Sequence, residues 1–426
     1  MTIIEPEAKP AQAARKPLSE FTFPSAEVTK CPYPFYEALR EEAPVYKYPG
    51  RNDYLLSRRE DILVVLHNPQ VFSNRRYLID PPEERFPELE AKPPGGVLET
   101  SYGLTASDPP EHSVKRRALR ALVNPRTLHA AETTLRRLAN ELIDGFIHTG
   151  AFELRTQFAD PLAVLTICEL AGFPPEDRDI YLGWHRIGTG HGRRFLTPEQ
   201  LAEQTKDHPA RQAYVEKTIL DRVANPRDDF LTEVIQAQIE RDGVLNMPYL
   251  SAEIGLILTA GNETTSRLMA NVVRLLLENP DQLQKVLDNR QLTANAIDEA
   301  LRLECPTQWI SRLVMEDTEI GGVKIPKGAF VIMLYASANR DETWVNPDKF
   351  DVEREGAREL TMSFGGGIHR CLGSPVGMLE GRVALEVILD RLKNLRFAPG
   401  READRENIDN FQKRVPKALH LLFDPQ

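Results

Sequence analysis

The sequence feature that most constrains the fold is a stretch of glycines around one cysteine, from Phe364 to Gly373. It reads Phe-Gly-Gly-Gly-Ile-His-Arg-Cys-Leu-Gly and precedes a run that predicts a long helix. A cysteine binds metal as the thiolate, and the free N–H groups and dipole of a helix N-terminus favour that anion. Glycine permits positive φ and lets a flat cofactor approach the backbone closely. The stretch therefore predicts a loop in which Cys371 binds a metal and the backbone holds a broad group.

Composition excludes several classes of protein. The formal net charge of −10 argues against a general nucleic-acid binder. No run of about 18 apolar residues occurs, which argues against a membrane anchor. The cysteines lie far apart and form no Cys-x-x-Cys pair, so neither a disulfide framework nor a structural zinc site is indicated. They are Cys31, Cys168, Cys305 and Cys371. We therefore expect a cytoplasmic protein.

The N-terminal quarter of the chain has little periodicity. Residues 1–30 lack regularly spaced apolar positions and predict a flexible leader, which leaves 31–426 as a single domain. Short helices are expected at 34–43 and 59–67, with a strand between them. Residues 74–106 carry many prolines and glycines, and an irregular segment of that length is typical of a lid or binding loop, or else of an irregular surface.

A basic helix is predicted after that segment. Asp108 is placed to cap the helix, and Pro109 suits its first turn. His112 precedes Arg116 by four residues, so both lie on one helix face. The other cations within these two turns are Lys115, Arg117 and Arg120. As a bare pattern, such a helix is typical of a solvated basic face.

The longest apolar stretch lies between Pro248 and Pro280. A helix over 249–279 would be roughly 45 Å long at about 1.5 Å per residue, long enough to cross the molecule. Its middle reads Ala260-Gly-Asn-Glu-Thr-Thr, where Gly261 costs about 1 kcal/mol relative to alanine. A glycine at that cost indicates a specific role for this position.

Together with the rest of the pattern, these segments predict a fold class that is mainly α with small β-sheets. Further helices are expected at 128–147, 161–171, 199–223, 294–303 and from the cysteine loop to about 391, and strands between 314 and 334. No Gly-x-Gly-x-x-Gly follows a predicted strand, so a dinucleotide-binding fold is not indicated.

Four separated elements point to one family. They are the cysteine loop, the long helix with Gly261, the pair Glu299-x-x-Arg302, and the helix with His112 and Arg116. With these elements in this order, the chain resembles the soluble bacterial cytochrome P450 monooxygenases from about Pro32 onward. The resemblance implies one large P450-type fold over 31–426, with haem between the long central helix and the cysteine loop.

The resemblance also implies a set of haem contacts. Cys371 would be the axial thiolate of the iron of haem b, because thiolate donates electron density that favours O–O cleavage. The other contacts implied along the haem are Ala260, Gly261, Phe364, Gly365 and Gly373. The anionic propionates need cationic or donor partners, for which the family implies His112, Arg116, Arg312 and His369. Each of these four could instead form a local salt bridge.

The predicted catalytic residues are Glu263 and Thr264. In the family, this segment distorts the long helix beside the iron and makes room for dioxygen. The Thr264 hydroxyl can donate to the carbonyl of residue 260, a bond that bends helices. An alcohol next to a carboxylate can relay protons through water to the reacting oxygen. The alternative is a buried, cap-like threonine and a surface glutamate.

Two more segments bear on the resemblance. Glu299 and Arg302 are expected to join Arg354 in a buried, structural network behind the haem. After the cysteine, the chain has Val376-Gly377-Met378 where the family commonly has Leu-Ala-Arg. A basic residue that belongs to the family's electron-donor surface is therefore absent at position 378.

The implied activity is insertion of one oxygen atom from O2 into a hydrophobic small molecule. The chain has no spare length for a flavin domain, so the family implies a separate ferredoxin and its NAD(P)H-dependent reductase as electron donors. Lys115, Arg117 and Arg120 would complement an acidic ferredoxin. Substrate walls are implied at 74–106, 173–200, 256–260 and 307–310, where Trp309 would line the pocket or belong to the core.

Two alternatives stay open on the sequence. A peroxide-dependent haem-thiolate enzyme would not need Glu263 and Thr264 in their usual form. A non-enzymatic haem-binding sensor or carrier would leave an acid and an alcohol beside the iron unexplained.

Overall fold

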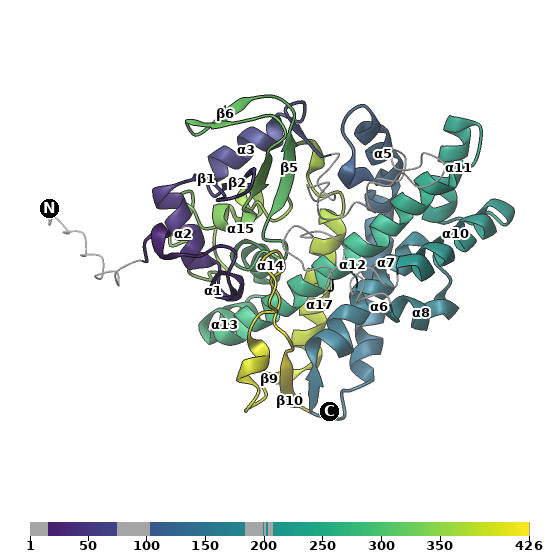
Figure 1. The fold of residues 1–426 in the computed structure, drawn as a ribbon. Coiled ribbons are helices and arrows are strands. Elements are labelled where there is room, and N and C mark those ends of the chain that lie inside the picture. Colours follow the sequence, from purple (N-terminus) through teal and green to yellow (C-terminus); the bar gives the residue numbers. More distant parts are fainter. Residues whose placement is uncertain (1–15, 75–102, 184–198, 200–201, 203–207, 426) are drawn as a thin grey trace, which may run out of the picture.

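The computed structural model describes residues 16–74, 103–183, 199, 202 and 208–425 of the chain. A larger helical part lies beside a smaller part that contains most of the strands (Figure 1). The predicted fold class, mainly α with small β-sheets, is confirmed.

The helices of the described residues have the following bounds, in chain order. They are α1 (Ala26–Lys30), α2 (Tyr33–Glu42), α3 (Arg59–His67), α5 (Glu111–Leu119), α6 (Pro125–Asp144), α7 (Asp160–Ala171), α8 (Arg178–Gly183), α10 (His208–Ala224), α11 (Phe230–Asp242), α12 (Met247–Glu278), α13 (Pro280–Asp288), α14 (Leu292–Leu303), α15 (Tyr335–Ala338), α16 (Ala357–Leu360) and α17 (Ser374–Arg391).

The strands form three small sheets. They are β1 (Val45–Lys47), β2 (Asp53–Leu56), β3 (Phe72–Ser73), β4 (Ala151–Glu153), β5 (Ile310–Val314), β6 (Thr318–Ile320), β7 (Val323–Ile325), β8 (Phe330–Met333), β9 (Lys393–Phe397) and β10 (His420–Asp424). The largest sheet has the order β1-β2-β8-β5-β3, the second β4-β10-β9, and β6 pairs with β7 alone.

Helix α12 runs through the middle of the helical part (Figure 1). Its 32 residues correspond to about 48 Å. The Asn246 side chain accepts a hydrogen bond from the Tyr249 N–H at 3.1 Å and caps the N-terminus. The helix ends before Pro280, which opens α13. The predicted helix over 249–279 is therefore confirmed.

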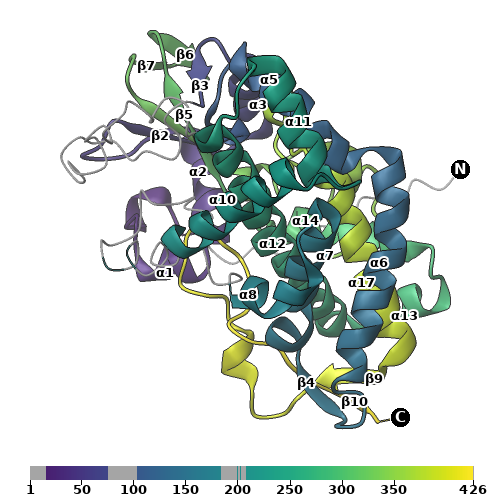
Figure 2. The same cartoon turned by 90° about the vertical axis from the view of Figure 1, so that its right-hand side faces the viewer.

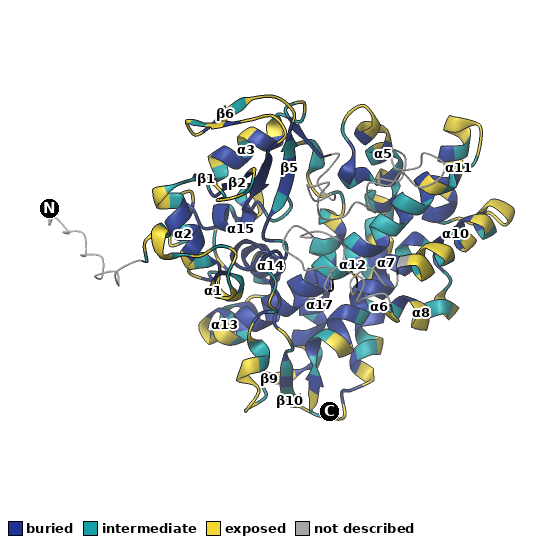
Figure 3. Cartoon of the chain, in the orientation of Figure 1, coloured by how far each residue is buried: buried dark blue, intermediate teal, exposed yellow. Residues whose placement is uncertain are grey.

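Two groups of helices bury α12 along its length. Helices α6, α7, α14 and α17 form the main hydrophobic cluster with its C-terminal half. On α6 the buried positions are Ala131, Leu135, Leu138, Ala139 and Ile143, the spacing of one helix face. Helices α8, α10 and α11 pack over its N-terminal half with α5 nearby (Figure 2). Burial is greatest around α12, α14 and α17 and falls toward α8, α10 and α13 (Figure 3).

The five-stranded sheet forms the centre of the smaller part. Strand β2 pairs with β8 in parallel, with Tyr54 opposite Val331, and the other neighbours are antiparallel. Every residue of β2 and β8 is buried, which fits a strand pair covered on both faces. This sheet fixes the position of β5, and therefore of Arg312, in the middle of the molecule.

The prediction of a flexible leader over 1–30 is wrong for residues 16–30. Helix α1 is capped by the Ser25 hydroxyl, which accepts from the Val28 N–H at 3.2 Å. Phe23 stacks on Phe35 with ring centroids 5.1 Å apart. These contacts come from a few irregularly spaced apolar anchors, which a search for periodicity does not detect. Residues 1–15 lie outside the described residues.

Several other expectations were incomplete or concern residues outside the described ranges. Helices α11 and α13 were not predicted, although Asp229 caps α11 by accepting from the Thr232 N–H at 2.8 Å. The expected lid at 74–106 and substrate wall at 173–200 lie largely outside the described residues. No helix of the described ranges is both long and apolar enough to cross a membrane.

Candidate functional site

The cysteine loop is closed by its own backbone. The Cys371 N–H donates to the carbonyl of Phe364 at 2.9 Å, and the Arg370 N–H donates to Gly367 at 3.2 Å. Phe364 is half-buried against the main hydrophobic cluster. Helix α17 begins at Ser374, and Gly373 occupies its N-cap position. The predicted placement of the cysteine just before a helix N-terminus is therefore confirmed.

The glycines of the loop have a predicted reason and a second reason that the sequence did not reveal. Gly365 and Gly367 have positive φ, as expected. A Cβ at Gly367 would lie 2.1 Å from the carbonyl oxygen of Leu66, at the end of α3, and a Cβ at Gly366 would lie 3.1 Å from the Leu66 side chain. At these two positions, the packing of the loop on α3 requires glycine.

The Cys371 thiol faces accessible space inside the molecule. Its side chain is exposed, yet burial is the largest influence on its pKa and raises it. A group that is both accessible and deeply surrounded by protein lines an internal space. The backbone N–H groups of Gly373 and Ser374 and the guanidinium of Arg116 lower the pKa of the thiol, so the surroundings of the sulfur stabilise an anion.

The middle of α12 also faces accessible space. Ala260, Gly261, Glu263 and Thr264 are only half-buried, whereas the residues from Thr265 to Leu276 are buried. The Thr264 hydroxyl donates to the Ala260 carbonyl at 2.9 Å, as predicted. Helix α12 is continuous through this segment, so the predicted distortion does not interrupt the helix.

Gly261 has a packing role in the structure. A Cβ at this position would contact the Ile167 side chain on α7 at 3.4 Å. The glycine therefore faces α7 and lets the two helices approach closely. The energetic cost of a glycine within a helix is offset by this contact between α12 and α7.

The first turns of α17 pack against α12 at the residue that follows its half-buried segment. The Thr265 hydroxyl lies 3.7 Å from the place that a Cβ at Gly377 would occupy. Gly377 follows Cys371 by six residues, and Thr265 follows Thr264 directly. The accessible thiol and the accessible threonine therefore belong to the same part of the interior.

Glu263 is held by two cations. Its carboxylate forms ion pairs with Arg267, one turn later on α12, and with Lys413. The side chain of Arg267 is 5% exposed and that of Lys413 is 6% exposed. The structure thus places Glu263 beside Thr264 in the chain but ties its carboxylate to a structural contact between α12 and the C-terminal segment.

Three elements bring the predicted donors for an anion together. His112 and Arg116 come from α5, Arg312 from β5, and His369 from the cysteine loop. The two imidazole rings lie 4.2 Å apart. Arg116 also donates to the Arg370 carbonyl at 2.8 Å, which fixes α5 to the loop. We call these four residues the donor cluster.

The donor cluster contains buried groups without a partner. Nε2 of His112 and Nε2 of His369 are buried and form no hydrogen bond within the described ranges. Burial lowers the pKa of His369 to about 2, helped by Arg312, His112 and Arg116. Burial and Arg116 also lower the pKa of His112. Cations and unpaired donors that converge in this way fit a group with two carboxylates, such as haem.

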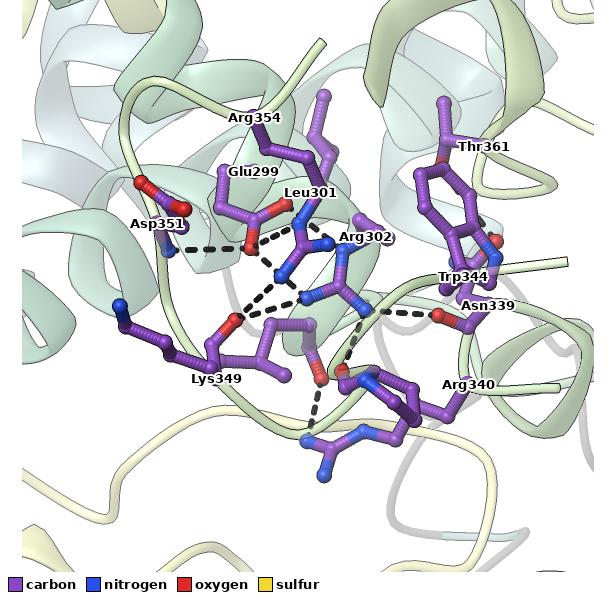
Figure 4. A network of polar contacts seen from close by, with 12 residues as sticks. Glu299, Leu301, Arg302, Asn339, Arg340, Trp344, Lys349, Asp351, Arg354 and Thr361 are labelled. Atoms are coloured by element: carbon purple, nitrogen blue, oxygen red, sulfur yellow. Dashed lines mark hydrogen bonds and ion pairs between the residues drawn. The ribbon is translucent and has the colours of Figure 1, made fainter. Parts of the chain in front are cut away.

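A second polar cluster, behind the loop, is closed (Figure 4). Arg302 donates to both Glu299 oxygens at 2.7 Å, and Arg354 donates to Glu299 Oε1 at 2.9 Å. The remaining donors of Arg302 reach the carbonyls of Asn339, Pro347 and Lys349. Glu299 and Arg302 are fully buried. The predicted network of these three residues is confirmed.

Two residues that position the start of the loop had no predicted role. The Asn339 side chain accepts from the Met362 N–H at 2.7 Å and donates to the Ser363 hydroxyl at 2.9 Å. Ser363 donates to the Leu301 carbonyl at 2.6 Å. These bonds connect the loop to α14. The sequence offered no signal for them beyond the polar run after Ala338.

Asp108 and Lys115 do not have the predicted roles. Asp108 accepts from the Asn74 N–H at 2.9 Å and from the Ser73 hydroxyl, so it anchors β3 instead of capping α5. Lys115 is buried, donates to the Ser107 hydroxyl at 2.8 Å and lies 3.9 Å from Glu253 on α12. Burial raises the pKa of Glu253 to about 7. Lys115 is therefore not part of an exposed docking face.

Trp309 belongs to the core. It is 2% exposed and packs in the hydrophobic cluster of the smaller part, with its ring 6.2 Å from that of Phe411. Of the two readings of this tryptophan from the sequence, the structure supports the core residue. Gln308 beside it is fully buried and donates to the Cys305 carbonyl at 2.7 Å.

The comparisons with known proteins point to one family. The family model described as Cytochrome P450 matches residues 199–420. Cytochrome P450 109 of Bacillus spizizenii is 34% identical over 367 residues, 84% of each chain. Vitamin D(3) 25-hydroxylase of Pseudonocardia autotrophica is 31% identical over 374 residues, 87% of this chain and 88% of that protein.

A solved structure supports the same fold. P450BioI in complex with hexadec-9Z-enoic acid ligated acyl carrier protein has a TM-score of 0.81 and 28% sequence identity. The match covers 94% of this chain and 99% of that chain. The fold and the site thus define a haem-thiolate monooxygenase, which carries haem b on a cysteine thiolate and receives electrons from redox partners. The chain belongs to the cytochrome P450 family.

Proposed function

We propose that Cys371 is the axial ligand of the haem iron. The observation that carries this proposal is the position of its thiol, which is accessible, deeply surrounded and next to the backbone N–H groups that begin α17. Of the other cysteines, Cys168 and Cys305 are buried, and burial raises the pKa of each thiol, to about 11 for Cys305. Cys31 is exposed at the end of α1.

The donor cluster is proposed to bind the haem propionates. His112, Arg116, Arg312 and His369 supply two guanidinium groups and two unpaired ring nitrogens from three elements. A carboxylate between these four side chains would accept hydrogen bonds for which the described residues offer no acceptor. Ala260, Gly261, Phe364, Gly365 and Gly373 are proposed to lie along the haem, with Gly261 contacting it through backbone because its side-chain position faces α7.

When bound, haem supplies the activation of dioxygen with two external electrons and the transfer of one oxygen atom to the substrate. The residues of the chain hold the haem, orient the reacting groups and supply protons. Thr264 is proposed to present its hydroxyl to the reacting oxygen from the half-buried face of α12. Glu263 is proposed to exchange protons with that hydroxyl through water, which requires that its ion pairs with Arg267 and Lys413 open.

A matched pair of variants tests the role of Thr264. Thr264 and Thr265 each donate to the carbonyl four residues earlier at 2.9 Å, but Thr264 is half-buried and Thr265 is buried against α17. Thr264→Ala should lower the ratio of product formed to electrons consumed, because no hydroxyl then directs protons to the reacting oxygen. Thr265→Ala should leave that ratio unchanged. Equal ratios for the two variants would remove Thr264 from the proposed proton path.

The electron donor is proposed to be a ferredoxin with an NAD(P)H-dependent reductase, in the cytoplasm. Arg117 and Arg120 are exposed on α5 and just after it, on the helix that also carries Arg116. The four cysteines form no disulfide, which fits a reducing compartment. Reduction by a ferredoxin should slow with added salt, and Arg117→Gln with Arg120→Gln should weaken that salt dependence.

The substrate is proposed to be a hydrophobic small molecule. Leu256 and Ile257 are half-buried on α12, in the turn before Ala260. Two relatives have names or titles that refer to largely apolar molecules, vitamin D(3) and hexadec-9Z-enoic acid. A screen for compounds that change the spin state of the ferric protein tests the proposal, and a set of hits made only of polar compounds would contradict it.

A further inference from the structure

A separate pocket lies on the other side of α5 from the donor cluster. Its volume is about 540 Å³, and it lies between α5, the turn that follows it, α11 and the first turn of α12. Pockets of about 300 to 1,000 Å³ are typical of small-molecule sites. Its lining includes Val114, Arg117, Ala118, Arg120, Ala237 and Tyr249.

Helix periodicity separates this pocket from the haem site. Val114, Arg117 and Ala118 are three and four residues apart and share one face of α5. His112 and Arg116, four residues apart, share another face, and neither lines the pocket. The same helix thus presents the donor cluster inward and this pocket outward.

The pocket carries unpaired positive charge. The guanidinium groups of Arg117 and Arg120 form no ion pair or hydrogen bond with any residue that the structure describes. Arg241 also lines the pocket, but its charge is matched by Asp242, whose two oxygens accept hydrogen bonds at 2.6 Å. Among the described lining residues, Glu233 is the one carboxylate. It lies in the first turn of α11, where the helix dipole favours an acid.

The rest of the wall is apolar with one buried hydroxyl. Val114 lines the pocket and is 43% exposed. Tyr249 is 6% exposed, and its ring lies below Lys115 and Arg241, at 5.8 Å and 4.9 Å. Its hydroxyl is buried and donates to no acceptor within the described ranges. The apolar lining that a ligand can reach is therefore Val114 with Ala118 and Ala237.

We propose that this pocket binds a small amphipathic anion, an organic acid whose charged group meets Arg117 and Arg120 and whose apolar part covers Val114 and Ala237. Guanidinium groups bind carboxylate, sulfonate and phosphate oxygens with charge-assisted hydrogen bonds. Val114 and Ala237 are exposed in the pocket and supply the apolar contact area that such a ligand needs. The site is independent of the haem chemistry, because α5 lies between the two.

The test is calorimetric titration of the haem-loaded protein with naphthalene-2-sulfonate, in saturating imidazole so that the iron is already ligated. Arg117→Gln combined with Arg120→Gln should weaken binding by about tenfold or more, the effect of losing one charge-assisted hydrogen bond. Ala237→Trp keeps the charges and fills the pocket from an exposed position on α11, and should weaken binding equally.

Two controls make the result specific. Lys324→Gln with Lys327→Gln removes the same charge from exposed positions around the β6–β7 hairpin and should leave binding unchanged. Naphthalene-2-sulfonamide, which has no charge, should bind at least tenfold more weakly than the sulfonate. The proposal is overturned if the native protein does not bind the sulfonate, if the pocket variants bind it as the native protein does, or if the sulfonamide binds equally well.

Discussion

Two buried polar clusters adjoin the cysteine loop, and they differ in how their charges are matched. In the Glu299 network, each carboxylate oxygen accepts from a guanidinium, and the other donors of Arg302 reach backbone carbonyls. In the donor cluster, His112 and His369 have buried ring nitrogens without a described partner. The first cluster is complete in the folded chain. The second needs an anion from outside the chain.

This difference distinguishes a cluster that stabilises the fold from a cluster that binds a ligand. A buried charge is costly unless it is paired, so the closed network contributes to the fold only while it stays whole. The donor cluster brings cations and imidazoles near one another, which opposes folding until an anion binds. The two clusters should therefore respond in opposite ways to loss of a charge.

The largest effect is expected for Glu299→Gln. The substitution leaves Arg302, which is fully buried, and Arg354 without their carboxylate, and the free energy of unfolding should fall by about 3 to 5 kcal/mol. Urea unfolding followed by circular dichroism measures it. The same change at Glu353, which pairs with Lys285 at the surface, should cost less than about 1 kcal/mol. Equal costs at the two glutamates would show that the network is not a buried unit.

The next effect is expected for Arg312→Gln in the donor cluster. Haem affinity should fall by about tenfold or more, because a charge-assisted hydrogen bond to a propionate is lost. The free energy of unfolding of the haem-free protein should rise slightly, by less than about 1 kcal/mol, because one of the adjacent cations is removed. Haem transfer to apomyoglobin measures the first quantity and urea unfolding the second.

Arg354→Gln is the matched control for Arg312→Gln. Arg354 belongs to the closed network, so its loss should destabilise the haem-free protein and leave the rate of haem transfer from the folded protein unchanged. If both variants affected stability and haem affinity in the same way, the distinction between the two clusters would be lost.

A smaller effect is expected from pH. Burial and the neighbouring cations lower the pKa of His369 to about 2, whereas an unfolded histidine titrates near 6.5. Below about pH 6.5 the unfolded chain binds a proton that the folded chain does not. The contribution of His369 to stability is therefore complete above pH 6.5 and is lost as the pH falls, by at most about 1.4 kcal/mol per pH unit.

Comparison of the native protein with His369→Gln isolates this contribution. In the haem-free state, the stability of the variant should decline less between pH 6.5 and 5 than that of the native protein. With haem bound, the two proteins should differ less, because nearby propionates raise the pKa of the imidazole. Parallel pH curves for the haem-free proteins would contradict the lowered pKa.

The smallest effect is expected for Lys115→Met. The variant loses the hydrogen bond to Ser107 and a cation near Glu253, at a cost of about 1 kcal/mol in the free energy of unfolding. The cost is limited because burial raises the pKa of Glu253 to about 7, and without Lys115 this carboxyl is protonated more readily. Arg117→Met, at an exposed position two residues later, should change stability by less than about 0.5 kcal/mol. A larger cost at Arg117 would contradict the burial of Lys115.

Local patterns were enough to predict the elements on which the site is built. The bracketing prolines and the apolar length predicted α12, and the glycine-rich loop before an apolar run predicted Cys371 ahead of α17. The resemblance added the partners of Glu299, which the structure confirms. The long helix and the cysteine loop are contiguous in sequence, so the chain alone reveals them, whereas the pairing of Glu299 with Arg354 spans 55 residues and depended on the resemblance.

The features that were missed depend on contacts between distant segments. Gly367 is required by the carbonyl of Leu66, about 300 residues earlier in the chain, and no local pattern contains that contact. Asp108 resembles a helix cap but binds the end of β3. Lys115 lies among exposed arginines in sequence, yet the approach of Glu253 on α12 buries it. Burial of single polar residues is set by tertiary packing and cannot be read from spacing.

The most direct test of the central claim is the absorption spectrum of the reduced protein with carbon monoxide. The account predicts the strongly red-shifted Soret band of thiolate-ligated haem in the native protein and in Cys31→Ser, and loss of that band in Cys371→Ser. A histidine-type spectrum in the native protein, or a thiolate-type band that persists in Cys371→Ser, would contradict it.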